Sequence, residues 1–308
     1  FERTMEVAAE ARDDALLVRA GTQRVYVLGY ELGRPDQALQ LAALLGILVT
    51  RAGDDPAARA SLLYRVGIVL RRKGAYAAAQ DHFERALPLW IAARGPNNAD
   101  VANTHNELGN VLLDQGRYDD AGAHYQQALE ISERTLGAEH PFTAGERGNL
   151  GILARLQGRF AAAQTYIEGS LAIFEATYGR DHMKAAEVVN ELANLYNDLG
   201  EPARALPHAE RAVAIATASA PADHPMRGYV LLTLGDTLIG LGRAAEAVAV
   251  LEQARSIQER AAGDPVDVAS AQLALARALW EAGGDRRRAR ELATAARAVY
   301  AAAGDRKR

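Results

Sequence analysis

Apolar and small residues follow helical spacing throughout this chain. Between 118 and 136, Tyr118, Ala121 and Tyr125 are separated by three or four positions, which places them on one face of a helix. The preceding segment, from Val101 to Gln115, carries a comparable apolar series. The alternation of apolar and polar residues that marks a strand is absent. We therefore predict an all-α fold built from pairs of helices, called helix A and helix B below.

The helical segments recur with a period of 42 residues, which is the spacing of a set of glycines. Repetition at a fixed period of about 20 to 50 residues is typical of solenoids and other repeat arrays. Glycine tolerates the positive φ at the end of a helix, so we expect each of these residues to end a helix A. The glycines are Gly74, Gly116, Gly158, Gly200, Gly242 and Gly284.

The repeat predicts one array of about seven helix pairs over 13–308, preceded at 1–12 by the end of another helix. In the last pair, Leu275-Ala276 comes one residue early, and Gly283-Gly284 absorbs the difference. The predicted units run roughly over 14–53, 57–95, 99–137, 141–179, 183–221, 225–263 and 266–303.

This pattern resembles the tetratricopeptide repeat, which has Leu-Gly in helix A and two alanines in helix B. The longer period and the turn Leu136-Gly-Ala-Glu-His-Pro141 make it similar to the kinesin-light-chain type. The last unit is also similar to arrays that follow the catalytic domain of some bacterial serine/threonine kinases. The resemblance implies a right-handed α-solenoid.

Composition narrows the functional classes. The net charge is −4 and the pI is about 6.0, so neither nucleic acid nor an anionic membrane surface is an expected partner. The chain contains no cysteine, which excludes disulfides and thiolate metal sites and is compatible with a reducing cytoplasm. The excess of arginine over lysine, with abundant alanine, suggests a bacterial coding sequence. We expect a cytoplasmic protein without a cofactor.

Three acid–histidine pairs could suggest a metal site or a catalytic site. They lie on successive repeats, at least a helix spacing of about 8–10 Å apart, so the three histidines cannot share one zinc ion. We interpret them as turn residues that satisfy free groups at helix ends. Because nucleophile, phosphate-loop and kinase motifs are also absent, we predict no enzymatic activity. The pairs are Glu139-His140, Asp181-His182 and Asp223-His224.

The strongest functional pattern is a group of asparagines on helices A, where asparagine is a poor helix former. An amide offers both a donor and an acceptor, which suits binding of a peptide backbone. In kinesin light chains the matching asparagines contact cargo peptides; Asn106 and Asn190 match them, whereas Gly148 and Leu232 depart from the pattern. The alternative is that the amides only cap and bridge helices. The predicted groove residues are Tyr64, Arg65, Arg71, Asn103, Asn106, Asn110, Arg155, Asn190, Asn194, Asn197 and Tyr229.

We predict that these asparagines hold the backbone of a protein or peptide segment in a concave groove, that the arginines attract acidic groups and that the tyrosines offer aromatic contact. One alternative is an effector-sensing array attached to a signalling domain such as a kinase. Another is a structural array that self-associates through its ends. A basic cluster, Arg286-Arg287-Arg288-Ala-Arg290, could bind phosphate or an acidic partner, or form a solvated turn.

Overall fold

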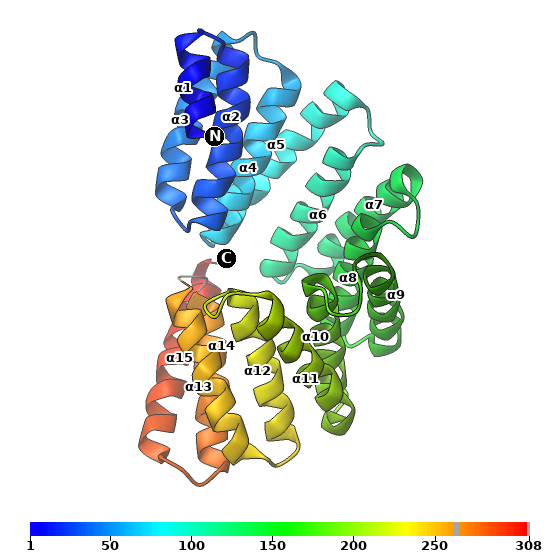
Figure 1. Ribbon diagram of the computed structural model, residues 1–308, viewed down its shortest axis with the longest axis vertical. Helices are drawn as coiled ribbons and strands as arrows, with labels where there is room; N and C mark the ends of the chain where they lie inside the picture. The colour runs from blue at the N-terminus through cyan, green and yellow to red at the C-terminus, as the bar shows by residue number, and fades with distance from the viewer. Residues whose placement is uncertain (262–264, 307–308) are drawn as a thin grey trace. The chain divides into compact units, whose positions relative to one another are not determined.

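The protein was analysed as a computed structural model that describes residues 1–261 and 265–306. Across these residues the chain forms fifteen α-helices and one short π-helix, η1, which confirms the predicted all-α solenoid of helix pairs (Figure 1). The predicted unit end at 263 and the last residues, 307–308, lie outside the described residues. The elements are α1 (Glu2–Glu10), α2 (Asp14–Tyr26), η1 (Val27–Glu31), α3 (Pro35–Arg51), α4 (Pro56–Arg72), α5 (Tyr76–Arg94), α6 (Ala99–Asp114), α7 (Tyr118–Leu136), α8 (Pro141–Leu156), α9 (Phe160–Tyr178), α10 (Met183–Asp198), α11 (Pro202–Ser219), α12 (Pro225–Gly240), α13 (Ala244–Arg260), α14 (Pro265–Glu281) and α15 (Arg286–Arg306).

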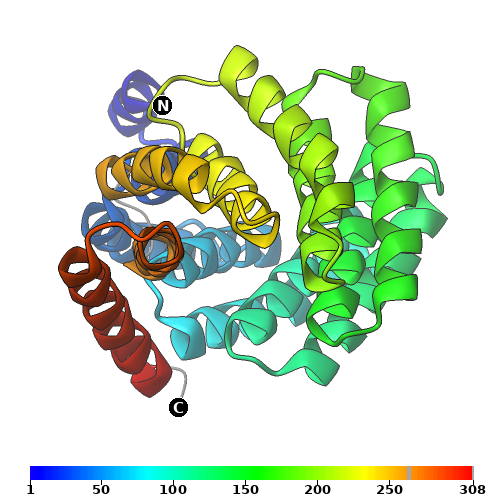
Figure 2. The same cartoon turned by 90° about the horizontal axis from the view of Figure 1, so that it is seen from below.

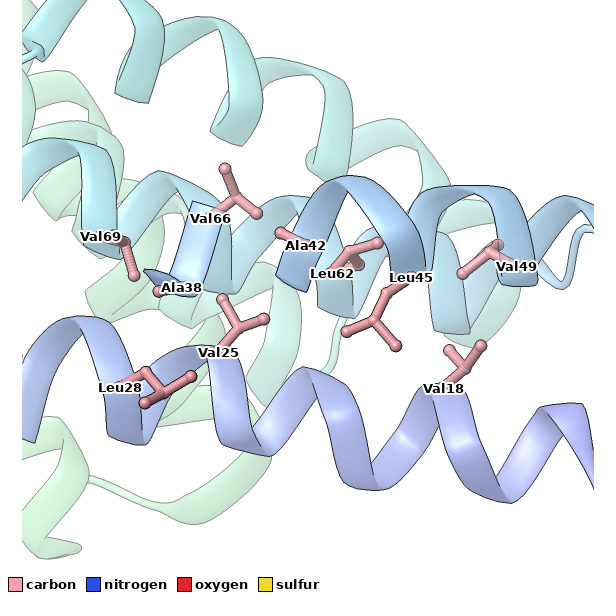
Figure 3. Packing of buried hydrophobic residues seen from close by; sticks show 10 residues of the cluster. All are labelled: Val18, Val25, Leu28, Ala38, Ala42, Leu45, Val49, Leu62, Val66 and Val69. Carbon is pink, nitrogen blue, oxygen red and sulfur yellow. The ribbon is translucent and has the colours of Figure 1, made fainter. Parts of the chain in front are cut away.

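The chain divides into two compact units, which we describe separately. The N-terminal unit covers residues 1–138, and the C-terminal unit covers 139–306. The boundary falls in the turn that carries the first acid–histidine pair. In the N-terminal unit, Figure 3 shows ten apolar side chains from α2, η1, α3 and α4 that point into the space between these helices. In the C-terminal unit, apolar clusters join each helix pair to the next one.

The turns within pairs follow the glycine prediction. Gly116 has a φ of 75°, and Gly74, Gly158, Gly200 and Gly242 have similar positive values. In the last pair the glycine with positive φ is Gly283 instead of Gly284, because the apolar register of α14 is shifted by one residue.

The three histidines of the acid–histidine pairs are helix N-caps. The Nδ1 of His140 accepts a hydrogen bond from the backbone N–H of Phe142 at 3.1 Å. His182 caps α10 and His224 caps α12 in the same way, at 3.2 Å each. Such a cap satisfies one of the free N–H groups at the helix start. This confirms that the histidines are turn residues.

Close approach of helix A to helix B explains the small residues of the repeat. A Cβ added at Gly109 of α6 would lie 2.5 Å from the ring of Tyr125 on α7. Gly67 meets Phe83 in the same way, and Gly151 meets Ile167. Only a residue without a side chain leaves room for the large partner sixteen positions later, so the glycine and its partner are a matched pair.

Candidate functional site

Polar side chains from helices A of the N-terminal unit converge on Arg71 of α4. Its Nε donates to Oδ2 of Asp114 at 2.8 Å, and its Nη1 lies 3.5 Å from Oε2 of Glu107. Both carboxylates belong to α6. On the same helix, Asn110 accepts a hydrogen bond from the hydroxyl of Tyr125 at 2.8 Å. We call these five residues the N-terminal polar cluster.

In this cluster, burial and the neighbouring charges shift the pKa values of the charged side chains in opposite directions. Burial raises the pKa of Glu107 above its ordinary value, although the guanidinium of Arg71 acts in the other direction. Burial also works against the charged form of Arg71, but Asp114 and Glu107 hold its pKa above the ordinary value. Arg71 therefore stays charged, with carboxylate partners from its own chain.

A related arrangement surrounds Arg155 of α8 in the C-terminal unit. Its Nη1 donates to Oδ2 of Asp198 at 2.6 Å, and its Nη2 lies 3.4 Å from Oε2 of Glu191, both on α10. The hydroxyl of Tyr229 on α12 donates to Oε1 of Glu191 at 2.5 Å, and the Nδ2 of Asn194 donates to the same hydroxyl at 3.3 Å. We call these five residues the C-terminal polar cluster.

Amides and hydroxyls next to this cluster join α10 to α12. Oδ1 of Asn194 accepts from Oγ1 of Thr233 at 3.0 Å, and the Nδ2 of Asn197 donates to Oγ1 of Thr237 at 2.9 Å. These two asparagines thus bridge neighbouring helices, which is the alternative that the sequence left open. Bridging fixes their orientation and does not use all of their hydrogen-bonding capacity.

Two titratable groups on α12, the phenol of Tyr229 and the carboxyl of Asp236, have raised pKa values. Burial, together with the carboxylate of Glu191, holds the pKa of the Tyr229 phenol well above its ordinary value, although 38% of this residue is exposed. Burial raises the pKa of Asp236 to about 6, with Asp198 adding to the effect and Arg277 opposing it. The phenol therefore stays neutral and remains a hydrogen-bond donor at physiological pH.

Several buried polar atoms in the C-terminal unit have no hydrogen-bond partner among the described residues. Asn190 on α10 is fully buried, and neither its Oδ1 nor its Nδ2 is paired. The Nε of Arg155 and the Oδ1 of Asn197 are unpaired as well. A buried polar group without a partner is unfavourable by about 1–3 kcal/mol, so each of these atoms would gain from a partner that the described residues do not supply.

The other predicted residues lie outside the two clusters. Tyr64 packs edge-on against Phe83 with ring centroids 5.6 Å apart, and the guanidinium of Arg65 lies 4.7 Å from the ring centre of Tyr26. Asn103 and Asn106 are half-buried on α6. The structure therefore brings together Arg71 with Asn110, and Arg155 with Asn194 and Tyr229. Asn197 and Asn190 lie on α10 beside the second group.

Sequence reasoning missed the carboxylates that partner the arginines. Glu107 and Asp114 recur as Glu191 and Asp198, 84 residues later, in step with Arg71 and Arg155. A search at twice the repeat length would have found this pattern. It was missed because charged residues on a helix usually mark a solvated face.

Neither a membrane-spanning helix nor a metal site is found among the described residues. Among the described residues, no helix is long and apolar enough to cross a membrane. Within 1–261 and 265–306, no three histidine, cysteine or acidic side chains are grouped so that they could hold a metal ion.

The solved structures that share this fold include the following three proteins. Putative kinesin light chain TPR-like repeats from Podospora anserina are 23% identical, cover 67% of this chain and 97% of their own, and give a TM-score of 0.52. The Rap conjugation gene regulator of plasmid pLS20 with the Phr* peptide is 16% identical, with coverages of 96% and 77% and a TM-score of 0.68. The apo quorum sensor NprR from B. thuringiensis is 15% identical, with coverages of 97% and 80% and a TM-score of 0.70.

Comparison with curated proteins finds no match. Models of the tetratricopeptide repeat match residues 58–111, 100–166 and 146–218, and a further one matches 229–265. These matches include more than half of the chain and agree with the helix pairs described above. The chain therefore belongs to the tetratricopeptide-repeat family, with an array similar to those of kinesin light chains.

Proposed function

We propose that this chain is a non-catalytic regulatory scaffold that binds a peptide segment along α8, α10 and α12 of the C-terminal unit. The observation that carries the proposal is the set of unpaired buried polar atoms on these helices, which belong to Arg155, Asn190 and Asn197. The set contains donors, in Arg155 and Asn190, and acceptors, in Asn190 and Asn197. A peptide backbone offers the complementary acceptors and donors.

The cluster next to these atoms is pre-ordered for binding. Arg155, Asn194 and Tyr229 are already held by hydrogen bonds, so little side-chain entropy is lost when a ligand arrives. The exposed part of the Tyr229 ring offers an aromatic surface beside them. Such a rigid aromatic residue beside fixed polar groups is typical of a peptide-binding surface.

The charges indicate which peptide fits. The C-terminal polar cluster contains one cation, Arg155, and two carboxylates, Glu191 and Asp198. The carboxylate of Asp236 adds negative charge nearby when it is ionised. This balance favours a neutral or basic peptide, in contrast to the attraction of acidic ligand groups that the sequence predicts for Arg155.

Proteins of the same fold support peptide binding. One is a Rap regulator in complex with the Phr* peptide, and another is a Rap protein complexed with the competence and sporulation factor. The TM-scores of 0.68 and 0.63 show a common fold, while identities of 16% and 12% leave the ligand of this chain to experiment.

The proposal can be tested with a random peptide library displayed on phage and selected on the whole chain. We expect enriched peptides to be neutral or basic, and Asn190→Ala to weaken their binding about tenfold, as expected for one lost pair of hydrogen bonds. Thermal melting of Asn190→Ala should not fall, because its amide has no partner to lose and its unpaired burial is unfavourable. The control Gln164→Ala, on the helix B α9, should leave binding unchanged.

Two results would contradict the proposal. One is the absence of any enriched peptide. The other is equal binding by Asn190→Ala and the parent chain. The companion variant Asn106→Ala combined with Asn190→Ala separates binding from folding, because unfolding of that double variant would show that the asparagines are structural.

An effector-sensing array is a second candidate, favoured by a cavity in the N-terminal unit. This cavity has a volume of about 570 Å³ and lies against α2 and the start of α4. The hydroxyl of Thr22, buried on its wall, has no hydrogen-bond partner among the described residues, and Arg19 and Gln23 lie beside it. Cavities of several hundred Å³ are typical of small-molecule sites.

The two candidates differ in their expected response to ligands. A panel of amino acids and dipeptides, screened by thermal shift, should raise the melting temperature of the parent chain but not of Thr22→Val if the cavity is an effector site. Attachment to a kinase domain and self-association through the array ends stay predictions.

A further inference from the structure

An apolar trench lies on the last helix pair of the C-terminal unit. It has a volume of about 310 Å³ and lies between α14 and α15, which follow α13 at the orange-to-red end of the chain in Figure 2. Leu273 and Trp280 of α14 line it, and they are 47% and 44% exposed. Ala289 and Ala293 of α15 form its opposite wall. Two large apolar side chains exposed side by side mark a candidate interaction surface.

The equivalent surface of the preceding pair is covered by a helix. Leu273 and Trp280 correspond in the repeat to Leu232 and Ile239 of α12, once the one-residue shift of α14 is included. Ile239 is only 3% exposed, because it packs in a core cluster that includes Leu275 and other residues of α14. Leu232 packs against the same cluster. The trench therefore occupies the place where a helix A lies on the previous pair.

Basic side chains flank the trench. The guanidinium groups of Arg286 and Arg290 lie 4.9 Å and 5.8 Å from the ring centre of Trp280. Their neighbour Arg288 pairs with Glu252 at 2.5 Å. Glu281 also lines the trench, but its carboxylate pairs with Arg277 at 2.8 Å, and among the described residues no carboxylate pairs with Arg286 or Arg290. These two cations are thus available to an acidic partner at the edge of an apolar surface.

We propose that this trench is a docking site for an acidic amphipathic helix of a partner protein. The partner's apolar face would cover Leu273 and Trp280, as α14 covers Ile239 on the preceding pair. Its carboxylates would reach Arg286 and Arg290. An apolar wall combined with cations at its rim fits a helix with one apolar and one acidic face, which is a common mode of helix recognition. This site prefers acidic partners, whereas the peptide surface on α10 prefers neutral or basic ones.

A peptide with the sequence of residues 99–114 is a suitable probe. This segment forms a helix A in the N-terminal unit, carries Asp100, Glu107 and Asp114, and contains neither lysine nor arginine. A fluorescent derivative, titrated with the whole chain and followed by anisotropy, should show saturable binding that weakens with salt. The control peptide carries Asp100→Asn, Glu107→Gln and Asp114→Asn and should bind about tenfold more weakly.

Variants of the chain locate the binding surface. Trp280→Ala should weaken binding of the acidic probe at least about tenfold, as expected when the central aromatic residue of an interface is removed. Arg286→Gln combined with Arg290→Gln should weaken it at low salt and much less at high salt. Ile47→Ala, which removes an exposed apolar side chain of the N-terminal unit, is the matched control and should change nothing.

The two tryptophans provide a direct readout. Trp280 is exposed and Trp90 is 4% exposed, so binding at the trench should shift the emission of Trp280 to shorter wavelengths in the parent chain. Equal binding of the probe by Trp280→Ala, or equal binding of the probe and its neutral control, would overturn the proposal. Sedimentation that shows self-association of the parent chain, lost in Trp280→Ala, would assign the trench to a second copy and would also overturn it.

Discussion

The two polar clusters contain the same four residue types at the same places in the repeat. In each cluster, however, the asparagine pairs with a tyrosine from a different helix of the repeat. In the N-terminal cluster, Asn110 accepts from Tyr125, which belongs to helix B of the same pair. In the C-terminal cluster, Asn194 donates to Tyr229, which belongs to helix A of the next pair. The first network therefore spans two helix pairs, from α4 to α6 and α7, whereas the second spans three, from α8 through α10 to α12.

One packing choice on helix B accounts for this difference. Tyr125 fits against Gly109, but the matching positions 84 residues later are Ala209 and Ala193. Two alanines fill the contact between α10 and α11 without a ring, and both are fully buried. No phenol comes from helix B there, and the next helix A supplies it. The position of one large side chain thus decides which helices a polar cluster connects.

The largest expected effect is the loss of stability on replacing an arginine, and it should be larger for Arg155 than for Arg71. The side chain of Arg155 is 14% exposed and that of Arg71 is 33% exposed. Arg155→Met leaves the buried Glu191 without its cation, so we expect a loss of about 3 kcal/mol in the free energy of unfolding. Arg71→Met should cost less, about 2 kcal/mol, because Arg71 and its partners Glu107 and Asp114 are more exposed than Arg155 and Glu191. Equilibrium urea unfolding measures both values, and equal losses would contradict the distinction.

The next effect concerns the helix contacts beneath the clusters. Gly109→Ala places a Cβ 2.5 Å from the Tyr125 ring, which has to shift, so we expect a loss of about 1–3 kcal/mol. Ala193→Gly, at the matching position of α10, should cost about 1 kcal/mol through helix propensity. Gly169→Ala is the control, because its Cβ would meet nothing within 4 Å, and it should stabilise the chain. A stabilising Gly109→Ala would show that the contact is loose.

A smaller effect distinguishes the two phenols. Tyr229→Phe removes a donor from a carboxylate, and we expect a loss of about 2 kcal/mol. Tyr125→Phe removes a donor from a neutral amide and should cost about 1 kcal/mol. Thermal melting of both variants against the parent chain checks the order. A larger loss for Tyr125→Phe would contradict the view that the carboxylate makes the stronger bond.

The smallest expected effects are pH dependences of opposite sign. In the N-terminal unit the Nδ1 atoms of His105 and His124 lie 2.9 Å apart, and burial, together with His124, lowers the pKa of His105 to about 4. Since its unfolded pKa is about 6.5, stability present above that pH is lost as the pH falls toward 4. His105→Gln should flatten this part of the melting-temperature profile.

Asp236 in the C-terminal unit should behave in the opposite way. Burial raises its pKa to about 6, from 3.8 in the unfolded chain. The folded state therefore binds the proton more tightly, and stability should rise as the pH falls from 6 toward 3.8. Asp236→Asn should remove this gain in a melting series over the same range. A profile unchanged by the substitution would show that the carboxyl titrates normally.

Much of the fold follows from local rules. The predicted helix from Tyr118 to Leu136 has the same bounds in the structure, because its apolar spacing and the flanking glycines are local features. The capping role of the histidines also follows from turn chemistry. In the last pair the positive φ lies at Gly283 and not at the predicted Gly284. The choice of ion-pair partners does not follow from local rules. Arg71 on α4 pairs with Asp114 on α6, and no local pattern predicts such a contact.

The sequence by itself determined the period, the helix pairs and the glycine turns, because each depends on residues close in the chain or on a repeat that can be counted. Only the tertiary structure decided how the asparagines are used. Asn194 and Asn197 bridge α10 and α12, whereas Asn190 is buried without a partner, although all three lie on the same helix. The reason is that an amide has several possible partners, and helix packing selects among them.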